Sequence, residues 1–137
     1  MGLDNGFYVK SNKRKITRDM LPSGIKYPFE KDYEGEVEIV YHRKDWGWRN
    51  EIMNTFGWRN ASEDQWKFEI DTPEDVITLI ELTASWLDGE RWESEGSSIW
   101  EYKDSRSHLI DDIINFALIY NFMQTNPDVY LEFYDSY

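Results

Sequence analysis

A change of hydrophobic period at Thr72 and Pro73 constrains the fold of this chain more than any other feature of its sequence. Over residues 65–70, polar residues alternate with Trp, Phe and Ile, a pattern typical of a half-buried strand. Thr72 can then cap a helix, and Pro73 suits the first helical position, where no hydrogen bond is lost. The helix should run to about Asp88, and its buried face should comprise Val76, Leu79, Ile80, Thr83, Ala84 and Leu87. A strand that leads directly into a helix indicates a fold that mixes the two.

Weaker patterns predict the other elements. Strands are expected at Gly6–Lys10, 34–41 and 128–134, and helices at 45–56 and 107–125. The 34–41 strand should have one wet face of glutamates and one buried face of Val37, Ile39 and Tyr41. Apolar residues cover most of the circumference of the last helix, which should make it the central helix of the core. We therefore expect a single α+β domain over residues 1–137, with about four mostly antiparallel strands packed on two or three helices.

The composition excludes several classes of protein. A chain without cysteine has no disulfide framework, thiol nucleophile or thiolate metal site. No apolar run reaches the length of about 18 residues that a membrane span needs, and the polar start at Met1–Gly6 is unlike a signal peptide. The sequence also lacks a phosphate-binding glycine loop and the Gly-x-Ser-x-Gly turn of a hydrolase nucleophile. We expect a cytoplasmic protein.

Negative charge is concentrated in the second half of the chain. The net charge is −12, made up of +2 over residues 1–60 and −14 over residues 61–137. A cationic partner is the natural complement of such a surface. We expect a polar loop at 88–104 whose acids, with Glu74, Asp75, Glu81, Asp111 and Asp112 on helix surfaces, form a negative patch. The residues expected to bind the partner are Asp88, Glu90, Trp92, Glu93, Glu95, Glu101 and Asp104.

In small size, acidity, aromatic richness and lack of cysteine, the chain resembles the small proteins with which phages inhibit host nucleic-acid enzymes, including DNA mimics and anti-CRISPR proteins. This resemblance is one of bulk character and carries over no functional residue. It implies a non-catalytic inhibitor that occludes a basic, nucleic-acid-binding surface of another protein. Such an inhibitor binds neither nucleic acid nor membrane directly, and a homodimer remains open.

Two other functions fit the composition. One is a small hydrolase that uses a pair of carboxylates on a carbohydrate or a cationic metabolite, since the chain has 27 acids and aromatic rings for stacking. The other is a protein that self-associates, with its basic N-terminal region on the acidic region of a neighbour. The basic cluster Lys10, Lys13, Arg14, Lys15 and Arg18, beside Phe7 and Tyr8, also fits a site for single-stranded nucleic acid, although a solvated loop explains it as well.

Only two histidines, His42 and His108, can supply imidazole ligands to a metal ion. His108 and Asp112 are four residues apart on the predicted 107–125 helix, so they should share one side and begin a metal site. A metal site needs several converging ligands, and a solvated histidine near the start of a helix is the simpler interpretation. We therefore expect no metal, no cofactor and no catalytic residue.

Overall fold

The computed structural model describes residues 4–32, 34–43, 46–56, 65–87 and 102–136. The elements follow in the order β1 (Asp4–Ser11), the 3-10 turn η1 (Arg18–Met20), β2 (Val37–Arg43), α1 (Trp46–Phe56), β3 (Gln65–Ile70), α2 (Pro73–Ser85), α4 (Tyr102–Thr125) and β4 (Val129–Ser136). The strands form one antiparallel sheet in the order β2-β1-β4-β3. The predicted α+β fold is confirmed.

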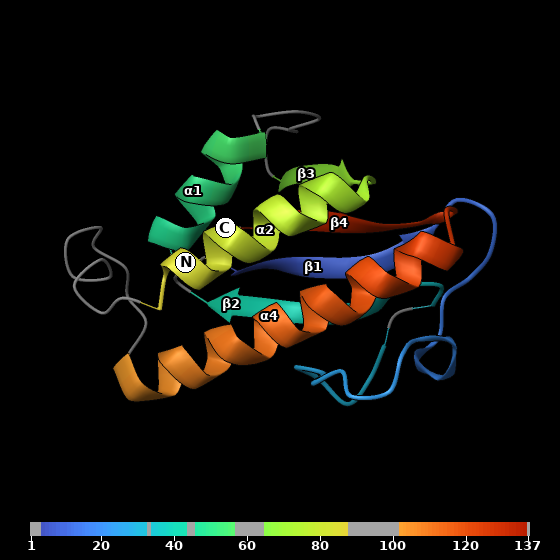
Figure 1. Cartoon of the computed structure of the whole chain (residues 1–137), viewed down its shortest axis with the longest axis horizontal. Coiled ribbons are helices and arrows are strands. Elements are labelled where there is room, and N and C mark those ends of the chain that lie inside the picture. Colours follow the sequence, from blue (N-terminus) through green and yellow to red (C-terminus); the bar gives the residue numbers. More distant parts are fainter. Residues whose placement is uncertain (1–3, 33, 44–45, 57–64, 88–101, 137) are drawn as a thin grey trace.

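The helices cover one face of this sheet (Figure 1). Phe7 on β1 shows this most directly, because its ring contacts Trp48 of α1, Phe116 of α4 and Phe133 of β4. Helices α2 and α4 also pack against each other along their lengths. Buried side chains from the strands, from the three helices and from the loop before β2 form one hydrophobic core. None of the helices among the described residues combines the length and the hydropathy that a membrane crossing requires.

Helix α2 begins as the sequence predicts. Thr72 is the N-cap, with its hydroxyl accepting a hydrogen bond from the backbone N–H of Asp75 at 3.2 Å, and Pro73 is the first helical residue. The helix ends at Ser85, three residues before the predicted end, where the chain turns and buries Trp86 completely.

Helix α4 differs from its prediction in two respects. It begins at Tyr102 and not near Ser107, so the last three residues of the predicted 88–104 loop are helical. Asp104 in this first turn suits the positive end of the helix. One side of the helix is also exposed, because Ile110 and Ile114 are about two-fifths exposed. It therefore lies across the sheet with one open side and is not enclosed by the core.

A β-bulge interrupts the pairing of β1 with β2. Phe7 pairs with Val40 and Tyr8 pairs with Glu38, which leaves Ile39 as an extra residue on β2. Gly6 makes this geometry feasible, because a Cβ atom at that position would lie 2.0 Å from the carbonyl oxygen of Val40. Any other residue at this position would force the two strands apart.

Candidate metal centre

The bulge determines which way the side chains at the end of β2 point. Strict alternation from Val37 places Tyr41 in the core, as predicted from the sequence, and would leave His42 outside. In the structure His42 is buried and Tyr41 is half-exposed, so the prediction for Tyr41 is wrong. The extra residue reverses the alternation beyond it, and the imidazole of His42 therefore points under the helices.

Inside the protein, His42 forms a hydrogen bond with a carboxylate of α4. Its Nε2 atom lies 2.6 Å from Oδ2 of Asp112, and both side chains are almost completely buried. The indole of Trp48, on α1, stacks on the imidazole with 3.9 Å between ring centroids and an interplanar angle of 14°. The sequence analysis placed Asp112 on a helix surface, and this is wrong because Asp112 is 3% exposed. His42 is thus held by two elements at once.

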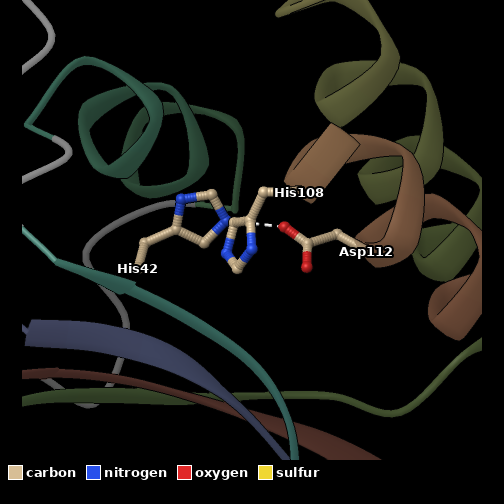
Figure 2. Close-up of side chains that lie close together, drawn as sticks. All are labelled: His42, His108 and Asp112. Carbon is tan, nitrogen blue, oxygen red and sulfur yellow. Dashed lines mark hydrogen bonds and ion pairs between the residues drawn. The ribbon is translucent and has the colours of Figure 1, made fainter. Parts of the chain in front are cut away.

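His108 completes the cluster from the preceding turn of α4. It lies four residues before Asp112 on the same side of the helix, as predicted, and its ring meets that of His42 edge to face at 5.0 Å. Its Nε2 atom donates a hydrogen bond to the backbone carbonyl of Tyr41 at 2.9 Å, so Nδ1 is the ring nitrogen that this bond does not use. His108 is half-buried, so the expected solvated histidine is not observed. Figure 2 shows the three side chains converging from the strand and the helix.

The three residues meet the geometric requirements of a metal site. One nitrogen of each imidazole and one carboxylate oxygen all lie within 4.8 Å of one another. Ligand atoms around a tetrahedral zinc ion are about 3.3 Å apart at bond lengths of about 2.0–2.2 Å. The Nε2 atom of His42 and the Oδ2 atom of Asp112 must therefore separate slightly, and His108 must approach.

A second set of buried polar groups lies beside His42 on the inner face of the sheet. Asn5 is opposite His42 on one side and opposite Asp135 on the other, and it is completely buried. Both amide atoms of Asn5 and one oxygen of Asp135 have no hydrogen-bond partner among the described residues. The other oxygen of Asp135 accepts hydrogen bonds from Arg49 of α1 at 2.7 and 2.8 Å. Burial raises the pKa of Asp135, and Arg49 opposes that rise.

Most residues predicted to bind a partner lie outside the described part of the chain. These are Asp88, Glu90, Trp92, Glu93, Glu95 and Glu101; the backbone of Asp104 belongs to the first turn of α4. The same applies to Asp45, where the predicted 45–56 helix begins.

The basic cluster of the N-terminal region is largely neutralised within the fold. Lys10 pairs with Glu36 and Glu132, Arg14 with Asp128, Lys15 with Glu34, and Arg18 with Asp32. Phe7, which was considered as a stacking platform for nucleic-acid bases, is completely buried. The structure therefore favours the interpretation of this segment as a loop held by ion pairs.

Helical spacing predicts that His108 and Asp112 lie close together, but no pattern in the sequence predicts that His42 lies beside them. The available signal was Gly6, because an isolated glycine inside a strand pattern indicates a bulge or a close backbone approach. Comparisons with protein families, with characterised proteins and with solved structures found no match to this chain.

Proposed function

We propose that this protein binds a divalent first-row transition metal ion through His42, His108 and Asp112. One observation carries the proposal: two imidazole nitrogens and a carboxylate oxygen from β2 and α4 converge within 4.8 Å. Two nitrogens and one oxygen suit Zn²⁺ better than Mg²⁺ or Ca²⁺, which prefer oxygen ligands. We choose zinc as the probe.

The surroundings of the cluster support this proposal. Histidines that bind metals usually donate their second N–H to a carbonyl or a carboxylate, as His108 does to Tyr41. The buried and unpartnered amide of Asn5, opposite His42, is a polar group that a water ligand of the ion can satisfy. An ion at this position would link β2 to α4, whose ligands are about 70 residues apart in sequence, and so stabilise the docking of the helix on the sheet.

Calorimetric titration of zinc into the chelator-treated protein tests the proposal. We expect one zinc ion per chain in the wild type and a Kd raised at least tenfold in Asp112→Asn, which keeps the shape of the side chain but loses the charged ligand. Asp111→Asn is the matched control, because it makes the same change on the adjacent, half-exposed residue. His42→Phe should also lose binding while keeping the stack on Trp48.

Equal zinc affinity in the Asp111 and Asp112 variants would rule the site out. So would a wild-type protein that binds no zinc at micromolar concentrations.

We also propose, as a second function, that the protein docks through its acidic surface onto a basic protein, acting as a phage-type inhibitor or nucleic-acid mimic. The observation that favours this function is the uneven pairing of charges. Lys10, Arg14, Lys15 and Arg18 are paired with the chain's own acids, whereas Glu74, Asp75 and Glu81 of α2 form no ion pair with a described residue. Excess negative charge is thus left on the helical side of the molecule, where Ile77, Ile110 and Ile114 add exposed apolar area.

Affinity capture from a nuclease-treated lysate of the source organism or its host tests the docking function. A basic nucleic-acid-binding protein should elute at high salt, and added DNA or RNA should displace it. Reversing the charges at Glu90, Glu93 and Glu95 should weaken capture more than reversing those at Lys13, Arg14 and Lys15. Equal effects of the two sets would refute an acidic docking face.

A further inference from the structure

A buried carboxylate on the open face of the sheet, opposite the helices, forms the centre of a second site. Glu38 of β2 is 6% exposed and lies over Gly6, which lacks a side chain and leaves room for the carboxylate. A Cβ atom on Gly6 would lie 3.0 Å from Oε2 of Glu38. Gly6 is opposite Tyr41 on β2 and opposite Tyr134 on β4, so the carboxylate occupies the space between two tyrosines.

One of the two oxygen atoms of the Glu38 carboxylate accepts a hydrogen bond within the protein. The hydroxyl group of Tyr134 donates to Oε2 of Glu38. The other oxygen, Oε1, accepts no hydrogen bond from a described residue. Glu38 also lines a hollow of about 430 Å³ together with Phe29, Lys31 and Asp32. Pockets for small ligands measure about 300–1,000 Å³, so this hollow has room for a small molecule or a side chain.

Aromatic rings surround the carboxylate. Phe29 packs against Tyr41 with ring centroids 5.0 Å apart, and Tyr8 packs against Tyr134 at the same distance. Phe29 is 44% exposed, which leaves its ring accessible. Aromatic faces around a carboxylate are the arrangement that binds an organic cation, through cation–π attraction and direct ion pairing.

We propose that Glu38, Phe29 and Tyr41 bind an organic cation, namely an alkylammonium group. The ammonium group would lie against Oε1 of Glu38, and its methylene or methyl groups would contact the rings of Phe29 and Tyr41. This site is distinct from the metal centre, because Glu38 and Tyr41 lie on the opposite face of the sheet from His42.

The charges around Glu38 are consistent with a cation. Burial raises the pKa of Glu38 to about 7, the hydrogen bond from Tyr134 lowers it, and the nearby carboxylates of Glu36 and Asp4 raise it further. A bound cation would favour the ionised form. Lys31 opposes the binding of a cation, because its positive charge lines the same hollow. Asp32 also lines the hollow, but its carboxylate is paired with Arg18.

Titration with n-butylammonium chloride, followed by the NMR signals of the Phe29 and Tyr41 rings, tests the proposal. We expect saturable shifts with a Kd in the millimolar range, no comparable shifts with n-butanol or sodium chloride, and a Kd raised at least fivefold in Glu38→Gln. Glu36→Gln, at the residue just before β2, is the matched control and should change the Kd less than twofold. Titration with Nα-acetyl-lysine amide, which keeps the side-chain ammonium group, then tests whether the cation is supplied by a lysine side chain of another protein. Tighter binding of this compound than of n-butylammonium indicates a protein side chain, and weaker binding indicates a free amine.

Phe29→Leu keeps the test decisive if Glu38→Gln does not fold, because the exposed ring contributes little to the core. It should raise the Kd at least threefold, and Lys31→Gln should lower it. The proposal is overturned by equal shifts with n-butanol, by equal effects of Glu36→Gln and Glu38→Gln, or by loss of binding in Lys31→Gln.

Discussion

Replacing Gly6 by alanine tests the bulge that directs His42 into the protein. The new Cβ atom would lie 2.0 Å from the carbonyl oxygen of Val40, whereas Cβ atoms in proteins essentially never approach heavy atoms within 3.0 Å. Strands β1 and β2 must therefore separate by about 1 Å at this point, which disrupts the ladder on either side of the bulge.

The magnitude follows from the hydrogen bonds that this separation weakens. Two or three backbone hydrogen bonds, at about 0.5–1.5 kcal/mol each, amount to roughly 1–4.5 kcal/mol of lost stability, with a middle value of about 3 kcal/mol. Alanine also restricts the unfolded chain, which returns about 0.4–1 kcal/mol. We expect a net loss of about 2–3 kcal/mol in the free energy of unfolding.

Urea unfolding of the wild type and Gly6→Ala measures this loss as a lower midpoint at an unchanged slope. Zinc affinity should fall in the same variant, because the end of β2 no longer presents His42 to α4. A destabilisation below about 0.5 kcal/mol, the range of ordinary surface substitutions, would refute the account of the bulge.

Three further predictions concern pH and individual contacts. The pKa of Glu38 is about 7 in the folded protein, whereas its ordinary value is 4.5. Between these values the folded state binds more protons than the unfolded state, so the free energy of unfolding should fall as the pH rises from 4.5 to 7, by at most about 3 kcal/mol. Glu38→Gln should remove that slope in unfolding curves measured from pH 4 to 8; an unchanged slope would contradict it. Thr72→Ala should cost about 1 kcal/mol through loss of the N-cap, and Thr78→Ala within α2 should cost less than half as much by urea unfolding. Arg49→Met should cost about 3–5 kcal/mol at pH 7, because Asp135 is left buried without its partner, and the cost should decrease as the pH is lowered, because burial raises the pKa of Asp135; a loss independent of pH would contradict this explanation.

The elements that the sequence predicts well are those with strong local signals. The strand at 65–70 and the start of α2 at Thr72 and Pro73 are as predicted, because alternation and capping act within a few residues. The apolar content of the long helix predicts its existence, but the predicted start at Ser107 is five residues later than the observed start at Tyr102. Serine residues such as Ser105 and Ser107 are common N-caps, and they therefore suggest a later start.

The candidate site depends on contacts that no local pattern contains. His108 and Asp112 share a helix, so their proximity follows from helical spacing. His42 joins them only because a bulge opposite Gly6 reverses the alternation of β2, and strict alternation predicts the opposite orientation. The burial of Glu38 likewise depends on contacts that are distant in sequence, because the space above Gly6 exists only once β1, β2 and β4 are paired.

The location of a bound zinc ion tests the central claim most directly. Crystals of the protein grown with equimolar zinc should show an anomalous difference peak at the zinc absorption edge between β2 and α4. The peak should lie about 2.0–2.2 Å from a nitrogen of His42, a nitrogen of His108 and an oxygen of Asp112. Zinc peaks confined to other parts of the molecule, with His42 still hydrogen-bonded to Asp112, would contradict the claim.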